Sequence, residues 1–196
     1  MAKISLNKST MIYPLPVVMV SCGISPEEYN IITVAWTGTI CSNPPMCYIS
    51  VRKERFSHPI IKKSGEFVIN LTNNKLAYPT DWCGVKSGKN HNKFKELQLT
   101  PGKAQIVNCP IIEESPLNIE CVVKDVIELG SHDMFLADVV AINAEENHFD
   151  KNTGAFHISN AEMITYMHGK YYLVGKKIGK FGFSVEGTGK KKNKPQ

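Results

Sequence analysis

Residues 30–57 read NIITVAWTGTICSNPPMCYISVRKERFS. An apolar, β-branched strand is predicted to end at residues 35–37, and the Ser-Asn-Pro-Pro segment at 42–45 predicts a turn. A second strand at 46–51 leads into a stretch with two arginines that ends at Ser57. Small residues, hydroxyls, a tryptophan and two arginines are therefore expected at one end of a sheet. Such a set suits a flat aromatic ligand with a phosphate, because guanidinium and hydroxyl groups bind phosphates through charge-assisted hydrogen bonds.

The composition predicts one ordinary globular domain. The chain has 196 residues, of which 42% are hydrophobic and 21% are charged. No apolar run reaches the roughly 20 residues that cross a bilayer, and residues 1–7 lack the apolar stretch of a secretion signal. We therefore expect a cytoplasmic protein with no membrane partner.

The positive charge is concentrated at the C-terminus. The net charge is +5, and four lysines (Lys190, Lys191, Lys192 and Lys194) lie in the last ten residues, so the remainder carries about +1. A general nucleic-acid binder needs a basic face on its folded domain, so we expect no nucleic-acid partner. Residues 187–196 are predicted to be a basic disordered tail.

The cysteine pattern argues against a metal site. None of the six cysteines forms a CxxC pair or has a histidine at zinc-ligand spacing, so no metal is expected. Most lie in apolar runs, which predicts buried thiols in a reducing compartment. Cys41 and Cys47 flank the central turn, and either ordinary packing or a redox pair fits that spacing.

Turn signals alternate with strand-like runs and predict a mainly antiparallel β-barrel with a few helices packed on it. The first expected helix spans 57–65, with Ser57 as its N-cap and Gly65 past its end. A second helix is expected from Asn74 to Gly84, interrupted by Pro79, and a short third segment at 91–94. The strands are expected at 17–22, 31–36, 46–51, 66–71, 117–129, 134–144 and 162–166.

Several catalytic signatures are absent. The chain has no GxxxxGK[ST], no strand–GxGxxG–helix unit, no GxSxG and no HExxH. The sequence therefore does not indicate a hydrolase. No catalytic acid or base can be named from it.

A binding constellation remains, and each member has two readings. Ser57 at a helix start and Arg52 five residues earlier could hold an anion, or could be a cap and a solvated strand end. Trp36 could border the ligand or belong to the core. His132 lies on a hairpin turn, where it could be a ligand contact or simply solvated. Tyr166 could face a pocket or line a sheet edge.

Taken together, these residues resemble the flavin reductase-like family, and within it the flavoredoxin-type FMN-binding proteins. The resemblance implies a mainly β fold, a split β-barrel of Greek-key type with a few peripheral helices, formed by residues 1–186. Its carriers are residues 30–36, the Pro44-Pro45 turn, 50–52 with Ser57, 65–70, 81–84, 87–89 with 93–94, 109–117, 130–132 and 179–184.

The resemblance also implies the cofactor and the residues that hold it. One FMN is expected per protomer of a homodimer, in a groove near the subunit interface. The residues expected to border the ring are Asn30, Thr33, Val34, Ala35 and Trp36. Those expected to hold the ribityl chain and the phosphate are Ser50, Val51, Arg52 and Ser57. Further contacts are expected from Ser87, Gly88, Lys89, His132 and Tyr166.

Three functions stay open on the sequence alone. The first is an FMN-dependent oxidoreductase that passes electrons from NAD(P)H to a flavin, ferric iron or protein acceptor. The second is a flavoredoxin-like electron-transfer protein that accepts electrons from a redox partner and has no NAD(P)H activity. The third is a non-catalytic β-barrel binding module.

Overall fold

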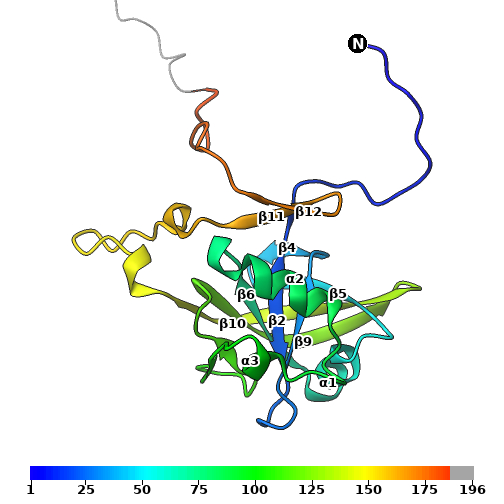
Figure 1. The fold of residues 1–196 in the computed structure, drawn as a ribbon. Helices are drawn as coiled ribbons and strands as arrows, with labels where there is room; N and C mark the ends of the chain where they lie inside the picture. The colour runs from blue at the N-terminus through cyan, green and yellow to red at the C-terminus, as the bar shows by residue number, and fades with distance from the viewer. Residues whose placement is uncertain (186–196) are drawn as a thin grey trace, which may run out of the picture.

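The computed structural model describes residues 1–185, so the expected basic tail lies outside the described residues. Seven strands form the main sheet: β2 (Val18–Cys22), β3 (Asn30–Val34), β4 (Thr37–Ser42), β5 (Pro45–Arg52), β6 (Glu66–Leu71), β9 (Leu117–Glu128) and β10 (His132–Ala144). Their order is β3-β2-β6-β9-β10-β5-β4, and all neighbours are antiparallel. The expected mainly β architecture is confirmed (Figure 1).

The sheet closes into a barrel at Ala35 and Trp36. β3 and β4 lie at opposite ends of the strand order, yet only these two residues connect them. Because each residue of extended chain spans at most about 3.5 Å, the two edges of the sheet must meet there. The backbone N–H of Ser50 on β5 donates to the carbonyl of Trp36 at 2.8 Å and fixes this corner.

The strands nearest the corner are buried on both faces. Val20, Ile49 and Phe67 point into the barrel with other apolar side chains. Met19 and Ile31 point outward and pack under the helices beside the sheet. This double coverage explains why β2 reads as a continuous apolar run instead of an alternating one.

Helix α1 (Ser57–Ser64) forms where it was expected, but its predicted N-cap is wrong. Ser57 is the first helical residue, and the cap position belongs to Phe56, which makes no side-chain capping bond. Gly65 ends the helix in the left-handed conformation, with φ of 69°, and its N–H donates to the Ile61 carbonyl at 2.9 Å.

Helix α2 (Ala77–Val85) follows a 3₁₀ turn at Asn74–Leu76, which is capped by the side chain of Asn73 instead of the expected Asn74. Pro79 lies in the first turn of α2, where its missing N–H costs no hydrogen bond, so it does not interrupt the helix. Gly84 lies inside α2 and does not stop it. A Cβ there would sit 3.3 Å from the Thr33 Cβ, so Gly84 permits close packing on β3.

A separate three-stranded sheet lies next to α2 and β4, at one end of the barrel (Figure 1). It consists of β1 (Leu15–Pro16), β11 (Ile164–Met167) and β12 (Lys170–Leu173). The sequence patterns predicted neither β12 nor β4, which lies between two expected strands. The remaining elements are α3 (Lys93–Glu96), β7 (Pro101–Gly102), β8 (Ile111–Ile112) and 3₁₀ turns at Glu146–His148 and Ile158–Ala161.

All six cysteines are free, and five are buried, as expected. The alternative of a Cys41–Cys47 redox pair is not supported. Cys47 faces the core, where its Sγ lies 3.5 Å from that of Cys121, whereas Cys41 is half-buried and pairs with Met46 in the strand ladder. Within residues 1–185, no helix is long and apolar enough to cross a membrane.

Candidate flavin site

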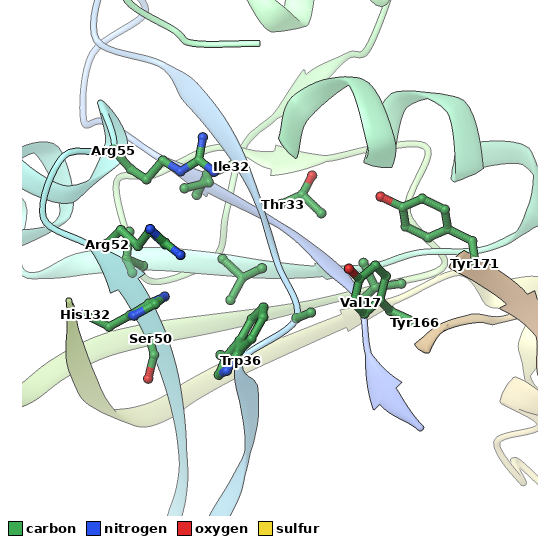
Figure 2. Close-up of a pocket in the computed structure, with 13 residues that line it drawn as sticks. Val17, Ile32, Thr33, Trp36, Ser50, Arg52, Arg55, His132, Tyr166 and Tyr171 are labelled. Carbon is green, nitrogen blue, oxygen red and sulfur yellow. The ribbon is translucent and has the colours of Figure 1, made fainter. Parts of the chain in front are cut away.

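A hollow lies at the corner where the barrel closes (Figure 2). We call it the corner hollow. Its wall is built from the end of β3 and the corner itself, with side chains added by β5, β10 and the separate β1-β11-β12 sheet. It is lined by Val17, Ile32, Thr33, Val34, Ala35, Trp36, Ser50, Val51, Arg52, Arg55, His132, Tyr166 and Tyr171.

Trp36 and His132 form an aromatic wall of the corner hollow. Their rings are stacked, with centroids 6.0 Å apart and planes inclined by 30°. Trp36 is 42% exposed, which excludes the reading of a core aromatic. Burial and the nearby Arg52 guanidinium lower the pKa of His132, so its imidazole is neutral at neutral pH. The wall is therefore aromatic and uncharged, which suits contact with a flat ring.

The two arginines and the two tyrosines lie on different sides of the corner hollow. Figure 2 shows Arg52 and Arg55 near His132, and the two tyrosines at the far side. Tyr166 and Tyr171 meet edge to face, with centroids 5.7 Å apart. The Tyr171 hydroxyl donates to Asp81 on α2 at 2.9 Å, and burial together with this carboxylate raises the tyrosine pKa.

A second, more polar hollow adjoins the first. Ile32 and Arg55 line both hollows, so the two are contiguous. We call the second one the polar hollow. It gathers hydroxyl, amide and cationic side chains from β3, the turn before α1 and the loop after α2. It is lined by Asn30, Ile32, Glu54, Arg55, Phe56, Ser57, Cys83, Lys86, Ser87, Gly88 and Lys93.

The amide of Asn30 is fixed at the wall of the polar hollow. Its Nδ2 donates to the Ser57 hydroxyl oxygen at 2.7 Å, and both residues are buried. A Cβ on Gly88 would lie 2.2 Å from Asn30 Oδ1, so only glycine lets the loop approach this amide. Ser57 therefore lines the polar hollow as the first residue of α1 and does not cap the helix.

Lys93 places a buried ammonium at the polar hollow. The residue is 3% exposed, and its Nζ donates to the carbonyls of Ile31 and Cys83, each at 2.7 Å. An ammonium has three donors, and the third has no protein acceptor within residues 1–185. No carboxylate in that range forms an ion pair with Lys93, and burial lowers its pKa. A buried cation without a counter-ion is costly, and an anionic ligand would offset that cost.

The structure brings together most of the residues expected from the sequence. Nine of the fourteen line the corner hollow: Thr33, Val34, Ala35, Trp36, Ser50, Val51, Arg52, His132 and Tyr166. Asn30, Ser57, Ser87 and Gly88 line the polar hollow. Lys89 is exposed and lines neither, but lies in a third depression next to the polar hollow.

The cofactor contacts expected from the sequence did not include Lys93, Arg55 or Tyr171. Arg55 is one of the two arginines that were expected at this end of the sheet, and Lys93 lies in the segment 93–94 that carries the family resemblance. Arg55 and Tyr171 lie close to residues that were singled out, and only the closed barrel shows that they share one hollow. Lys93 opens α3, where Asn92 caps the helix by accepting from the Lys95 N–H. Its burial depends on contacts with β3 and α2 that no local pattern encodes. No cluster of metal-ligating side chains occurs within residues 1–185.

The family defined by the flavin reductase like domain matches residues 10–175. This chain belongs to that family. Flavoredoxin of Desulfovibrio vulgaris (Miyazaki F) is 28% identical, with a TM-score of 0.86 over 94% of this chain and 100% of that chain.

Two further solved structures of lower identity share the fold. Flavoredoxin from Methanosarcina acetivorans is 24% identical, with a TM-score of 0.85 over 95% of this chain and 98% of that one. The FMN-binding protein from Thermus thermophilus is 22% identical, with a TM-score of 0.73 over 92% and 97%. The expected split-barrel family is thereby confirmed.

Proposed function

We propose that this member of the flavin reductase-like family binds FMN and acts as a flavin-dependent oxidoreductase. The observation that carries the proposal is the contiguity of two hollows with complementary chemistry. The corner hollow offers aromatic and apolar walls for a ring, and the polar hollow offers cations and hydroxyls for a phosphate. FMN, when bound, supplies the hydride and electron chemistry.

The buried ammonium of Lys93 supports the phosphate end of this proposal. Its remaining donor and the guanidinium of Arg55 would bind phosphate oxygens through charge-assisted hydrogen bonds. The Ser57 and Ser87 hydroxyls border the same space. The phosphate would also give Lys93 the negative partner that residues 1–185 do not provide.

At the ring end, this chain's residues would set position and charge. Trp36 and the neutral His132 would provide a flat surface for a ring. Arg52 and Arg55 border the corner hollow, so they would favour negative charge on whatever occupies it. Their positive field would therefore ease reduction of a bound flavin.

We further propose that electrons come from NAD(P)H or from a redox protein, and that the chain works as a cytoplasmic homodimer. Five buried free thiols suit a reducing compartment. Anaerobic mixing with NADH or NADPH separates the two electron sources. Rapid bleaching of the flavin bands supports the nicotinamide, and bleaching only with a reduced redox protein supports the electron-transfer form.

The visible spectrum of the purified protein tests FMN binding itself. We expect yellow protein, or colourless protein that quenches the fluorescence of added FMN with one site per chain. Protein that neither carries nor binds FMN would contradict the proposal and favour a non-catalytic binding module.

A further inference from the structure

Asp133, the second residue of β10, is a buried carboxylate with two basic partners. It is 1% exposed, and its Oδ2 lies 2.8 Å from Nε2 of His58, which is 7% exposed. Its Oδ1 lies 3.3 Å from Nζ of Lys53. Burial opposes ionisation of Asp133, but His58 and Lys53 outweigh it and lower its pKa. An ionised carboxylate can only accept hydrogen bonds, so the His58 imidazole donates to it.

Each of these three residues directly follows one that lines a hollow of the candidate flavin site. The neighbouring pairs are Arg52–Lys53, Ser57–His58 and His132–Asp133. Arg52 and His132 line the corner hollow, whereas Ser57 lines the polar hollow. Because successive side chains of a strand point to opposite faces, Asp133 lies behind the surface that His132 presents. The buried carboxylate therefore connects segments that build both hollows.

The contact between His58 and Asp133 joins α1 to β10. At the corner hollow, His132 already pairs with Arg52 in the ladder between β10 and β5. Helix α1 has no such ladder to β10, and the hydrogen bond from His58 joins them instead. The His58 ring also meets the fully buried ring of Phe135 edge to face, with centroids 5.3 Å apart. The start of α1, which carries Ser57, is thus anchored to the strand that carries His132.

We propose that Asp133, acting through His58, is a positioning residue that sets the spacing between the ring end and the phosphate end of the flavin site. The inference rests on the proposed function, in which FMN fills both hollows. A ligand with two linked parts gains affinity when both parts bind at once, and it loses that gain when the spacing of the two sites is wrong. Riboflavin has the same ring and ribityl chain without the phosphate, so its binding does not depend on this spacing.

The test compares the binding of FMN and riboflavin by fluorescence titration of the full chain. The readout is the dissociation constant of riboflavin divided by that of FMN, which a change in overall stability leaves unaltered. We expect Asp133→Asn to lower this ratio at least about threefold, because the charged partner of His58 is lost. The direction is diagnostic, since removal of a nearby negative charge would by electrostatics alone favour the phosphate and raise the ratio.

Two variants of His58 test the contact from the other side. His58→Leu removes the donor and should lower the ratio at least about threefold. His58→Gln places an amide N–H near the position of Nε2 and should keep the ratio within about twofold of that of the unmodified protein. The matched control is His148→Leu. His148 is also buried, lies 3.4 Å from the Glu145 carboxylate and meets Phe156 edge to face, but lines neither hollow, so the ratio should not change.

The outcomes separate this inference from the proposed function. A ratio that is unchanged or higher in Asp133→Asn overturns the inference and leaves FMN binding standing. A ratio as low in His58→Gln as in His58→Leu also overturns it. If His58→Leu does not fold, Asp133→Asn still decides, because asparagine and aspartate have nearly the same volume. Failure of the unmodified protein to bind either flavin overturns both proposals.

Discussion

Lys93 has the most unusual environment among the residues of the site. Its ammonium is held by two carbonyls, from β3 and α2, and Lys93 lines the polar hollow without a protein counter-ion in residues 1–185. An exposed lysine could adopt many rotamers, whereas this one is oriented before a ligand arrives. Such preorganisation reduces the entropy lost on binding.

We expect Lys93→Met to weaken FMN binding about tenfold to a hundredfold. The lost charge-assisted hydrogen bond is worth about 1.5–3 kcal/mol, and methionine fills a similar volume. Lys95→Met, two residues along and exposed, is the control and should bind normally. Fluorescence titration measures both affinities. Equal affinities in the two variants would show that the phosphate is held elsewhere.

Gly88 gives a second prediction at the residue scale. A Cβ at this position would lie 2.2 Å from Asn30 Oδ1, so alanine must displace the amide that donates to Ser57. Overpacking of this kind costs about 1–3 kcal/mol. We expect Gly88→Ala to weaken FMN binding at least about fivefold.

The control for that variant is Gly175→Ala, where a Cβ would meet nothing within 4 Å. Isothermal titration calorimetry gives both affinities, and circular dichroism checks that the fold persists. Normal FMN affinity in a folded Gly88→Ala protein would mean that the Asn30–Ser57 pair does not shape the phosphate position.

At the scale of elements, the carboxylate of Glu120 on β9 binds the loop that precedes β8 through hydrogen bonds. Glu120 is fully buried and accepts from the backbone N–H groups of Gln105, Ile106 and Val107 at 2.7, 2.7 and 3.0 Å. Asn143 on β10 donates to it at 2.7 Å. Burial opposes ionisation of Glu120, but these donors outweigh it and lower its pKa.

Glu120→Gln should therefore destabilise the fold by about 2 kcal/mol or more at neutral pH, since hydrogen bonds to charged groups contribute about 1.5–3 kcal/mol each. The folded-state pKa lies below the unfolded value of about 4.3. The contribution is thus present above that value and is lost as the pH falls towards the folded pKa. Urea unfolding of the unmodified protein and of Glu120→Gln at pH 7 and pH 4 measures this contribution. If the two proteins differ by the same free energy of unfolding at both pH values, the prediction is contradicted.

Local sequence patterns predicted the helices and strands better than they predicted the environments of individual side chains. Strands with strong apolar runs, such as β6, were recognised, because both faces of the sheet are covered there. β4 was missed because its sequence, TGTICS, is short of apolar residues, and three of its six residues are exposed. Ser57 matched a cap pattern but lies one residue inside the helix. The distinction between Lys93 and Lys89 depends on tertiary packing, which neighbours in sequence do not reveal.

At the scale of the whole molecule, the two ends of the described chain extend away from the barrel (Figure 1). The segments carry exposed apolar residues, among them Ile4, Ile12, Ile178 and Phe181. Burial of these side chains against a second copy of this chain would stabilise the proposed homodimer.

We expect light scattering to give twice the mass of one chain. Residues 1–12 lie outside every described strand and helix. A variant that lacks them should form a weaker dimer, with a higher dissociation constant than that of the full chain. The full chain at matched concentration is the control. A monomer that holds FMN at all concentrations would contradict the homodimer and leave the flavin site intact.

Ala35 and Trp36 join the two edge strands and also line the corner hollow. A thermal fluctuation that separates β3 from β4 would therefore disrupt the surface that contacts a flavin ring. We call this junction of β3 and β4 the seam. Release of the ligand and opening of the seam would then have the same rate-limiting step. Amide hydrogens around the seam should exchange with deuterium at a rate that falls in step with flavin saturation, while those of the β6–β9 ladder hardly respond.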